Sequence, residues 1–381
     1  MDALVQQGAQ VWMLGSAMHT DAAWTEPARV AARQSGLQAC EVYQRSLVSR
    51  VQHLGGRVVR KLTGHRPVLV EGLPEVPGEM PAWFAAWIKR VEPDVILVNY
   101  AAFASLLPGT LPAGTLTVVD SHDLMSLNVA LRAKTLAAIQ QCLADPQDPI
   151  LTDLKDWEPG PTGIGAWELA GYERFNRSLF ITERDTELVR AAATHTRPHF
   201  LPFTIEASAE TGNCEGAALF VAGDNPFNSL ALELLLRRIQ PAVSRRQPDF
   251  RLQVAGRVKK VTDIQSPAVV QLGAVPEVAP LYRSSRFFVN SVFTGTGQQI
   301  KISEAMAHGL PVVAFQTAAA ASPLVHGESG LVANTPEEMV EHILTLWNNP
   351  RQCRELGQNA REAIRTHARR YGQEYIWNLF K

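Results

Sequence analysis

One stretch in the C-terminal half of the chain limits the possible folds more than any other. An apolar run, Phe287–Val292, precedes a loop that contains Gly295 and Gly297. A helical pattern follows, with its apolar positions at Ile300, Ile302, Ala305 and Met306. Gly309 is a helix-termination signal, and Leu310–Phe315 is apolar throughout, as expected of a buried strand. This strand–helix–strand succession predicts the parallel sheet of an α/β protein.

The loop before this helix has the chemistry of a phosphate site. A helix N-terminus presents unpaired backbone N–H groups and the positive end of the helix dipole. Lys301 lies in the predicted first turn, where a cation opposes the dipole unless an anion compensates it. The alternative is that the glycines only allow the strand to pack closely against the helix, as in many α/β proteins.

The complete string is more specific than the glycines alone. Lys301 is followed by Glu304-Ala-Met-Ala-His-Gly-Leu-Pro-Val-Val313, and this string resembles the donor-site signature of the family 4 (group 1) retaining glycosyltransferases. The resemblance extends from about Leu219 to about His367, and more thinly through the N-terminal half. It implies the GT-B fold, in which two Rossmann-like doubly wound parallel-sheet domains face a cleft. It also implies transfer of a sugar from a nucleotide-diphosphate sugar, without a metal or another cofactor.

Composition agrees with a two-domain globular chain. The 381 residues are 46% hydrophobic and 19% charged, so two sizeable cores are possible. The net charge of −1 gives no global attraction to nucleic acid. No Cys-x-x-Cys spacing predicts a zinc site or a disulfide framework, and this favours a reducing compartment; the cysteines are Cys40, Cys142, Cys214 and Cys353. The N-terminus lacks the pattern of a signal peptide, so we expect a cytoplasmic protein.

We predict an acceptor-side domain at 1–207, a nucleotide-sugar domain at 208–366 and, at 367–381, a helix that crosses back to the first domain. The linker is predicted within Glu206–Glu215, which is polar and rich in turn residues. Gln10–Gly15 resembles the second strand of the family, so the first strand and its glycine turn are not visible. A shortened or misassigned start and a degenerate enzyme are the two interpretations of this difference.

A predicted strand, Thr115–Val119, leads into Asp120-Ser-His-Asp123. Residues at the carboxyl ends of parallel strands face the ligand crevice of a doubly wound sheet. The resemblance implies that His122 approaches the donor sugar near its anomeric end, with Asp120 and Asp123 as further catalytic candidates. The alternative for His122 is an ordinary structural histidine.

The resemblance also implies a set of donor-binding residues. Glu304 matches the second of two family glutamates and is expected to bind the ribose hydroxyls, whereas the position of the first is Thr296. The sequence therefore predicts no carboxylate at that position, and loop amides would have to replace it. Asn228 is expected to hold its own loop against the motif helix, and Arg257 to act as a second cation unless it is only a solvated surface residue. The predicted donor residues are Gly223, Asn228, Arg257, Gly295, Thr296, Gly297, Lys301 and Glu304, and the base is expected at Val270, Leu272 and Gly273.

Residues 43–70 carry six basic residues and no acidic one, with apolar positions at helical spacing. Such a segment suits an anionic membrane surface or a lipid-linked acceptor, which would make the protein peripheral at the inner face of the membrane. The alternative is a solvated helix face. Two other functions stay open: a catalytically inactive GT-B-like partner subunit and a nucleotide-sugar epimerase. A NAD-dependent enzyme is disfavoured, because no Gly-x-Gly-x-x-Gly follows an early strand.

Overall fold

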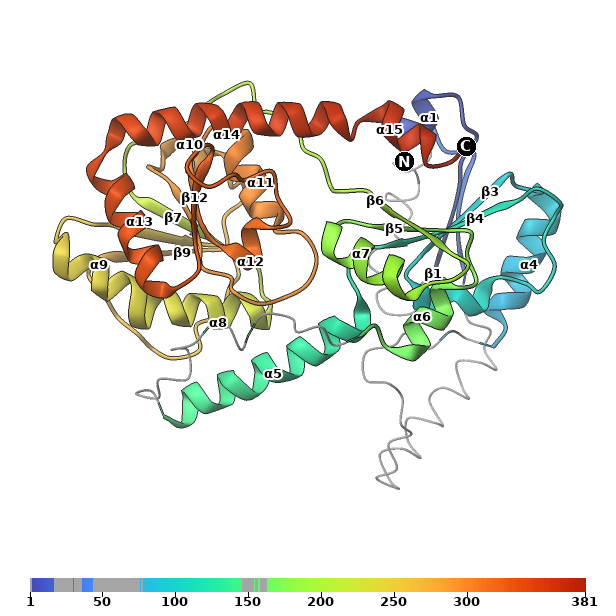
Figure 1. Cartoon of the computed structure of the whole chain (residues 1–381), viewed down its shortest axis with the longest axis horizontal. Helices are drawn as coiled ribbons and strands as arrows, with labels where there is room; N and C mark the ends of the chain where they lie inside the picture. The colour runs from blue at the N-terminus through green and yellow to red at the C-terminus, as the bar shows by residue number, and fades with distance from the viewer. Residues whose placement is uncertain are drawn as a thin grey trace.

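Three parallel sheets organise the structure, a computed structural model that describes residues 2–16, 30, 36–43, 76, 78–145, 154, 157 and 163–381. A four-stranded and a six-stranded sheet form two α/β domains side by side, and a two-stranded sheet lies with the first (Figure 1). We call the part built on the four-stranded sheet the N-terminal domain and the other part the C-terminal domain. The predicted α/β architecture with two parallel-sheet domains is confirmed.

The N-terminal domain has the strand order β3-β4-β5-β6, and β1 pairs with β2 beside it. Its strands are β1 Trp12–Ser16, β2 Ala39–Tyr43, β3 Val95–Asn99, β4 Leu116–Ser121, β5 Arg177–Phe180 and β6 Arg197–Phe200. Its helices are α1 Asp2–Gln6, α4 Met80–Val91, the 3₁₀ helix η2 Ala101–Leu106, α5 Met125–Ala144, α6 Ala166–Tyr172 and α7 Glu183–Ala192.

The C-terminal domain has the strand order β12-β11-β10-β7-β8-β9. Its strands are β7 Ala218–Val221, β8 Leu252–Ala255, β9 Val269–Gly273, β10 Phe288–Asn290, β11 Val312–Phe315 and β12 Gly330–Ala333. Its helices are α8 Pro226–Leu234, the π-helix η4 Leu235–Ile239, α9 Gln240–Arg246, α10 Ala279–Ser284, α11 Ile300–Ala307, α12 Gln316–Ala319, α13 Pro336–Asn348 and α14 Pro350–Arg370, followed by α15 Gln373–Asn378.

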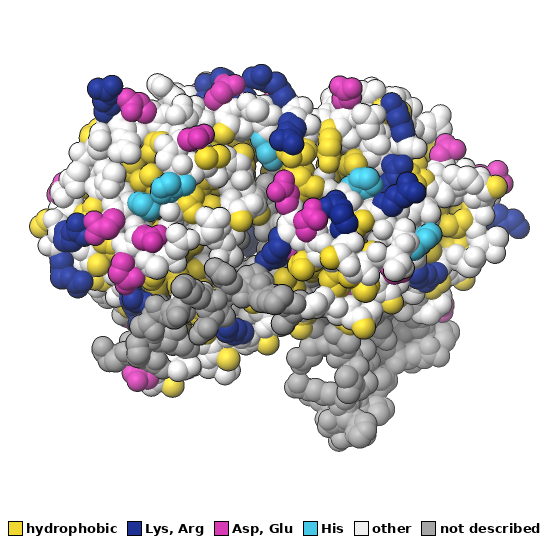
Figure 2. Space-filling model, in the orientation of Figure 1, with side chains coloured by type: hydrophobic (Ala, Val, Ile, Leu, Met, Phe, Trp, Pro, Cys, Tyr) yellow, Lys and Arg dark blue, Asp and Glu magenta, His cyan; other side chains and the backbone are white. Residues whose placement is uncertain are grey.

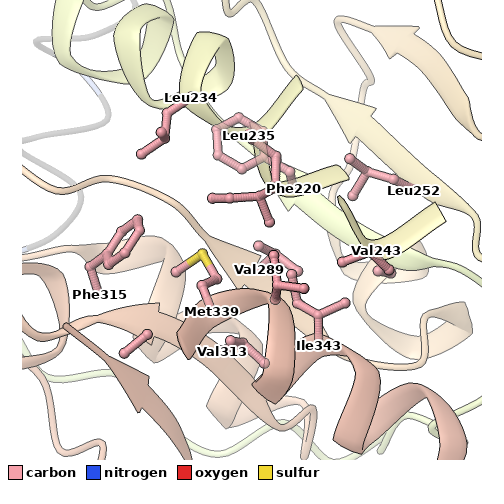
Figure 3. Close-up of a cluster of buried hydrophobic side chains, with 14 of the residues drawn as sticks. Phe220, Leu234, Leu235, Val243, Leu252, Val289, Val313, Phe315, Met339 and Ile343 are labelled. Atoms are coloured by element: carbon pink, nitrogen blue, oxygen red, sulfur yellow. The ribbon is translucent and has the colours of Figure 1, made fainter. Parts of the chain in front are cut away.

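Residues from both faces of the C-terminal sheet and from the helices that cover it form two buried hydrophobic clusters. In one of them Phe220 and Leu252 of the strands meet Leu235 of η4 and Met339 of α13 (Figure 3). Each of these side chains is at most 1% exposed. Strands buried on both faces read as continuous apolar runs, and for this reason β7 and β11 were visible in the sequence.

The motif helix α11 ends as its sequence predicts. Gly309 has φ +70°, and its N–H bonds to the carbonyl of Met306 while the N–H of Leu310 bonds to the carbonyl of Ala305. These two bonds and the left-handed glycine are a Schellman motif, which satisfies carbonyls at the helix end. Of the four apolar positions in the pattern, Ile302, Ala305 and Met306 are fully buried, whereas Ile300, the first helical residue, is 40% exposed.

Two long helices, α14 and α5, run between the domains. α14 runs along the C-terminal domain towards the N-terminal one, and α15 follows it and contacts α1 (Figure 1). Beyond α14, Tyr375 donates a hydrogen bond to the carbonyl of Phe200, and Arg177 donates one to the carbonyl of Leu379, at the edge of the N-terminal sheet. On the opposite side α5 begins in the N-terminal domain and packs against α8. The boundaries 1–207, 208–366 and 367–381 stay a prediction.

The sequence analysis did not find α5, although it has 20 residues. Its apolar residues are spread around the helix because different faces contact different domains. Leu127 and Leu131 join the N-terminal core, and Ala138 and Cys142 join the C-terminal one. A helix of this kind has no clear apolar stripe, so periodicity does not reveal it. Within the described residues, none of the helices combines the length and the hydrophobicity needed to cross a membrane.

Candidate functional site

The order of the C-terminal strands fixes where a ligand can bind. The chain runs outwards from β7 to β8 and β9, and then returns to the other side of β7 with β10. Ligands of open α/β sheets bind outside the carboxyl ends of the strands at such a switch point. Gly223 follows β7, and the loop from Ser291 to Gln299 follows β10. The predicted loop residues Gly223, Gly295, Thr296 and Gly297 therefore lie at the switch point.

Two helices begin there as well. Asn225 caps α8 by accepting a hydrogen bond from the N–H of Phe227 (2.8 Å), and Pro226 occupies the first helical position. α11 begins at Ile300, so Lys301 lies in its first turn, as predicted. The N-termini of α8 and α11 therefore both point N–H groups towards the switch point, which favours an anionic ligand there.

The loop before α11, Gly295–Gln298, lies against the N-terminal domain; we call it the donor loop. Gly297 has φ +74°, and a Cβ there would lie 3.0 Å from the carbonyl oxygen of His122. The Gln298 side chain accepts a hydrogen bond from the N–H of Phe203 (2.9 Å) and donates one to its carbonyl (3.1 Å). Glycine is required at position 297 because the loop passes so close to the strand end of the other domain. Figure 2 shows the molecular surface hollowed between the two domains.

One hydrogen-bonded group joins the donor loop to the turn after β4. The Thr296 hydroxyl donates to Asp123 Oδ2 (2.9 Å), and the Asn128 amide donates to the same oxygen (2.8 Å) and to Thr296 Oγ1 (2.6 Å). We call Asp123, Asn128 and Thr296 the interdomain triad. Position 296 itself carries no carboxylate, as the sequence predicts, but the hydrogen bond brings the carboxylate of Asp123 from the other domain against it. Asn128, in the first turns of α5, was missed, because that helix was missed.

His122 and Asp120 lie beside this triad. His122 is exposed at the end of β4, with its Nε2 3.7 Å from Asp120 Oδ2. The contact with the Asp120 carboxylate raises the pKa of His122 above its usual value. The Tyr100 ring packs edge-on to His122, with 5.5 Å between centroids, and burial raises the pKa of Tyr100 to about 12. Burial also raises the pKa of Asp123, while the hydrogen bonds from Thr296 and Asn128 oppose that rise.

A buried carboxylate fixes the turn that carries His122 and Asp123. Glu168 of α6 is fully buried and accepts hydrogen bonds from the N–H groups of Met125 (2.7 Å) and Ser126 (2.9 Å) at the start of α5. It also accepts from the Ser126 hydroxyl and from Tyr172, whose hydroxyl in turn lies 2.9 Å from the hydroxyl of Ser121. Glu168 therefore caps α5 from another helix, since the N-cap residue of α5, Leu124, cannot do so.

Glu304 is held by two partners. Lys301 Nζ lies 3.0 and 2.8 Å from its two carboxylate oxygens, and the buried Tyr282 hydroxyl donates to Oε2 (2.9 Å). The Glu304 side chain remains 25% exposed. Desolvation raises the pKa of Tyr282, and the Glu304 carboxylate adds to that rise. The three-residue spacing of Lys301 and Glu304 suits this pair, whereas no sequence signal indicated Tyr282, which lies in the preceding helix α10.

The remaining predicted residues lie farther from the triad. Asn228, in the first turn of α8, donates to the carbonyl of Gly223 (3.1 Å) in the loop before that helix, and its expected role in holding this loop against the motif helix stays a prediction. A contact with the donor loop comes from Phe227, whose ring would meet a Cβ on Gly295 at 3.6 Å. Arg257 is exposed and has no ion-pair partner in the described part of the chain. The predicted base-binding residues Val270, Leu272 and Gly273 lie at the end of β9, where Val270 is 48% exposed.

Outside the switch point, the described residues offer a concave surface on the C-terminal domain but no cluster of metal ligands. A concave surface of about 510 Å³ lies between α9 and α13, lined by arginines and glutamates that pair with one another, as Arg238 does with Glu337. Its charges serve helix packing on the C-terminal domain. Across the ranges described, no three His, Cys, Asp or Glu side chains gather as a metal site would require. The basic segment 43–70 lies almost wholly outside the described residues.

A known family is similar to the C-terminal domain of this chain. Residues 216–349 match the sequence model described as "Glycosyl transferases group 1". Over these residues the chain is similar to the group 1 glycosyltransferases. The matched residues begin just before β7 and end with α13, so they contain the switch point, the donor loop and the pair Lys301–Glu304.

Two curated relatives are similar to only part of the chain, at 26% and 30% identity. An "Uncharacterized 44.6 kDa protein in cps region" of Klebsiella pneumoniae is 26% identical over 200 residues, which are 49% of this chain and 51% of that protein. An "Uncharacterized glycosyltransferase" of Haemophilus influenzae is 30% identical over 158 residues, 38% of this chain and 43% of that protein. The chain thus aligns with about half the length of these curated relatives.

A solved structure shows the fold over nearly the whole chain. The structure of Anabaena HepE in complex with UDP has a TM-score of 0.61, with 12% identity and 97% of each chain covered. At this identity the likeness shows the fold alone. Together with the two parallel-sheet domains, it confirms the predicted GT-B fold of the chain.

Proposed function

We propose that the protein transfers a sugar from a nucleotide-diphosphate sugar to an acceptor. The observation that carries this proposal is the hydrogen bond between Thr296 of the donor loop and Asp123 of the other domain. That bond brings the helix termini that suit a diphosphate against the turn that carries His122. A site for leaving-group charge and a set of polar side chains near the sugar then share one cleft.

Each part has a role in the proposed reaction. Charge develops on the leaving diphosphate, and the N-termini of α8 and α11 with Lys301 stabilise it without reorganisation. Arg257, free of ion pairs in the described part of the chain, is available as a second cation. Glu304 accepts hydrogen bonds from the ribose hydroxyls, and His122 contacts the sugar near the anomeric carbon. The base binds at the end of β9 through Val270, Leu272 and Gly273.

We further propose UDP as the nucleotide, because the HepE structures were solved with UDP and with UDP-glucose. Retention of anomeric configuration and independence of metal follow from the family resemblance. The cps-region protein of Klebsiella supports an acceptor in surface-polysaccharide synthesis, either a glycan or a lipid-linked intermediate. A cytoplasmic location, with residues 43–70 at the inner face of the membrane, fits that acceptor.

A thermal-shift screen tests the donor. The full chain is heated with UDP, GDP, ADP, dTDP and CMP and with their common sugar conjugates. A ligand present at 100 times its dissociation constant stabilises the folded protein by about 2.7 kcal/mol, which is easily measured. We expect UDP and one or more UDP-sugars to raise the melting temperature. A chain that responds to none of these compounds would contradict the proposed donor site.

A turnover assay distinguishes the proposed enzyme from the alternative of a catalytically inactive partner subunit. The enzyme is expected to release UDP from the UDP-sugar that the screen selects, slowly with water and faster with its acceptor. Binding without release under both conditions would favour the partner subunit. An epimerase would instead change the sugar while it is still attached to the nucleotide, or release it as the epimer, which nuclear magnetic resonance of the product detects.

A further inference from the structure

The interdomain triad gives Asp123 an unusual position. Its Oδ2 takes the bonds from Thr296 and Asn128, whereas no donor to Oδ1 exists among the described residues. Asp123 is half-buried, and its carboxylate touches the donor loop from the opposite domain. A carboxylate accepts hydrogen bonds only, so the free oxygen needs a hydroxyl, an amide or water as its partner.

The position of the donor loop tells which partner is available. This loop opens α11, whose N-terminus is the proposed site of the diphosphate. In a nucleotide sugar, the sugar is bonded directly to that diphosphate, so its ring lies one step beyond the helix N-terminus. Hydroxyl groups of the ring are the donors that would come next to Asp123.

We propose that Asp123 binds hydroxyl groups of the donor sugar and that Thr296 and Asn128 orient its carboxylate for this. This inference rests on the proposed function and extends it to recognition of the sugar. Oδ2 accepts one hydrogen bond from each domain. These two bonds fix the orientation of the carboxylate, and thereby the position of Oδ1. Carboxylate–hydroxyl bonds are charge-assisted and are among the stronger hydrogen bonds of a binding site.

The proposed contacts of the nucleotide and of the sugar depend differently on closure of the cleft between the domains. The nucleotide contacts belong to the C-terminal domain alone, whereas Asp123 reaches the sugar only while the donor loop lies against the N-terminal domain. The Gln298–Phe203 bonds hold the loop there, and Phe227 of α8 packs in the hydrophobic cluster of the N-terminal domain. Sugar recognition therefore requires the closed cleft, and UDP binding does not.

Isothermal titration calorimetry of Asp123→Asn tests the inference, with UDP, UDP-glucose and UDP-N-acetylglucosamine as the probes. We expect unchanged UDP affinity and weaker binding of a UDP-sugar by about 10- to 100-fold, the range of a charge-assisted hydrogen bond. Thr296→Val removes one donor to Oδ2 and should cause a smaller loss of the same kind. Asp94→Asn is the matched control, because Asp94 is exposed at the opposite end of β3.

Moving the carboxylate gives a sharper test. Thr296→Glu alone places a second carboxylate against Asp123, so both UDP-sugars should bind more weakly. Combined with Asp123→Asn, the same substitution returns the site to one carboxylate, and sugar affinity should recover by at least about 3-fold over either single variant. The melting temperature of each variant shows that it is folded.

Two results would overturn the inference. If UDP binds but Asp123→Asn leaves the affinities for both UDP-sugars unchanged, Asp123 does not bind the sugar. If UDP and the UDP-sugars weaken equally, Asp123 acts on the nucleotide or on the fold. A wild-type chain that binds no UDP would instead contradict the proposed function, and the inference with it.

Discussion

Glu168→Gln should destabilise the turn that carries His122 and Asp123 and leave nucleotide binding unchanged. The fully buried Glu168 carboxylate caps α5 with two backbone N–H bonds and accepts two hydroxyl bonds. A glutamine has one acceptor oxygen in place of two, and its NH₂ group would point at an N–H or hydroxyl donor. At least one backbone N–H of the first turn of α5 therefore loses its acceptor in a partly buried place.

The magnitude follows from these contacts. Loss of the cap leaves a backbone N–H without an acceptor, and this costs about 1–3 kcal/mol. Removing the negative charge from the positive end of α5 costs a further 0.3–1 kcal/mol or so. We expect a total of about 3 kcal/mol, which is a large part of the roughly 5–15 kcal/mol that stabilises a typical domain.

Guanidinium unfolding, followed by tryptophan fluorescence, measures that loss. Glu173→Gln is the matched control, because Glu173 also accepts backbone N–H bonds, from Thr194, His195 and Thr196, but on the surface, where water replaces a lost acceptor. UDP affinity should stay unchanged, while the imidazole resonances of His122 should shift. A Glu168→Gln protein with the unfolding midpoint of the control and unshifted His122 resonances would refute the reasoning.

Four further predictions concern the site and its surroundings. In Asp120→Asn the pKa of His122, followed by nuclear magnetic resonance, should fall; since it is raised in the wild type, the pair stabilises the fold at low pH and that contribution disappears as the pH rises through the raised value. His122→Ala should cut turnover strongly at nearly unchanged UDP affinity, and normal turnover would reject its role. Glu304→Gln should weaken UDP binding by about 1–3 kcal/mol in calorimetry, and unchanged affinity would remove the donor-site assignment. Co-sedimentation with anionic vesicles should fall with salt and on charge reversal of Arg57, Arg60 and Lys61, whereas no binding at any salt concentration would contradict the membrane contact.

Local signals made the C-terminal site readable from the sequence. The α11 segment could be predicted because its start, its buried face and its Schellman end depend on residues within about ten positions of one another. The same holds for α13, which the Thr335 side chain caps through the N–H of Glu338, and for α7, which Thr182 caps in the same way. Strands β2 and β12 were missed because each has only four or five residues, too few for a clear apolar periodicity.

The contacts between the domains could not be predicted, because they leave no local pattern in the sequence. Asp123 and Thr296 are 173 positions apart, and nothing in the spacing of either residue shows that they meet. Tyr282 and Glu168 are similar cases, since each acts on a helix other than its own. A tyrosine and a glutamate within apolar helical segments read as surface residues or as core residues, and only packing decides that they bind a carboxylate and a helix N-terminus.

The triad also changes how the missing family glutamate is interpreted. From the sequence, Thr296 meant a lost carboxylate, and that loss, together with the N-terminal glycine turn that is not visible, supported an inactive subunit weakly. In the structure the Thr296 hydroxyl is a donor, and it holds a carboxylate that comes from the other domain. A glutamate at position 296 would meet Asp123 with like charge in a partly buried place, where repulsion is weakly screened. Threonine at 296 and aspartate at 123 therefore depend on each other, and a chain with this pair keeps one carboxylate beside the donor loop. The difference from the family pattern is then a relocation of the acidic group, and it no longer favours the inactive subunit over the enzyme.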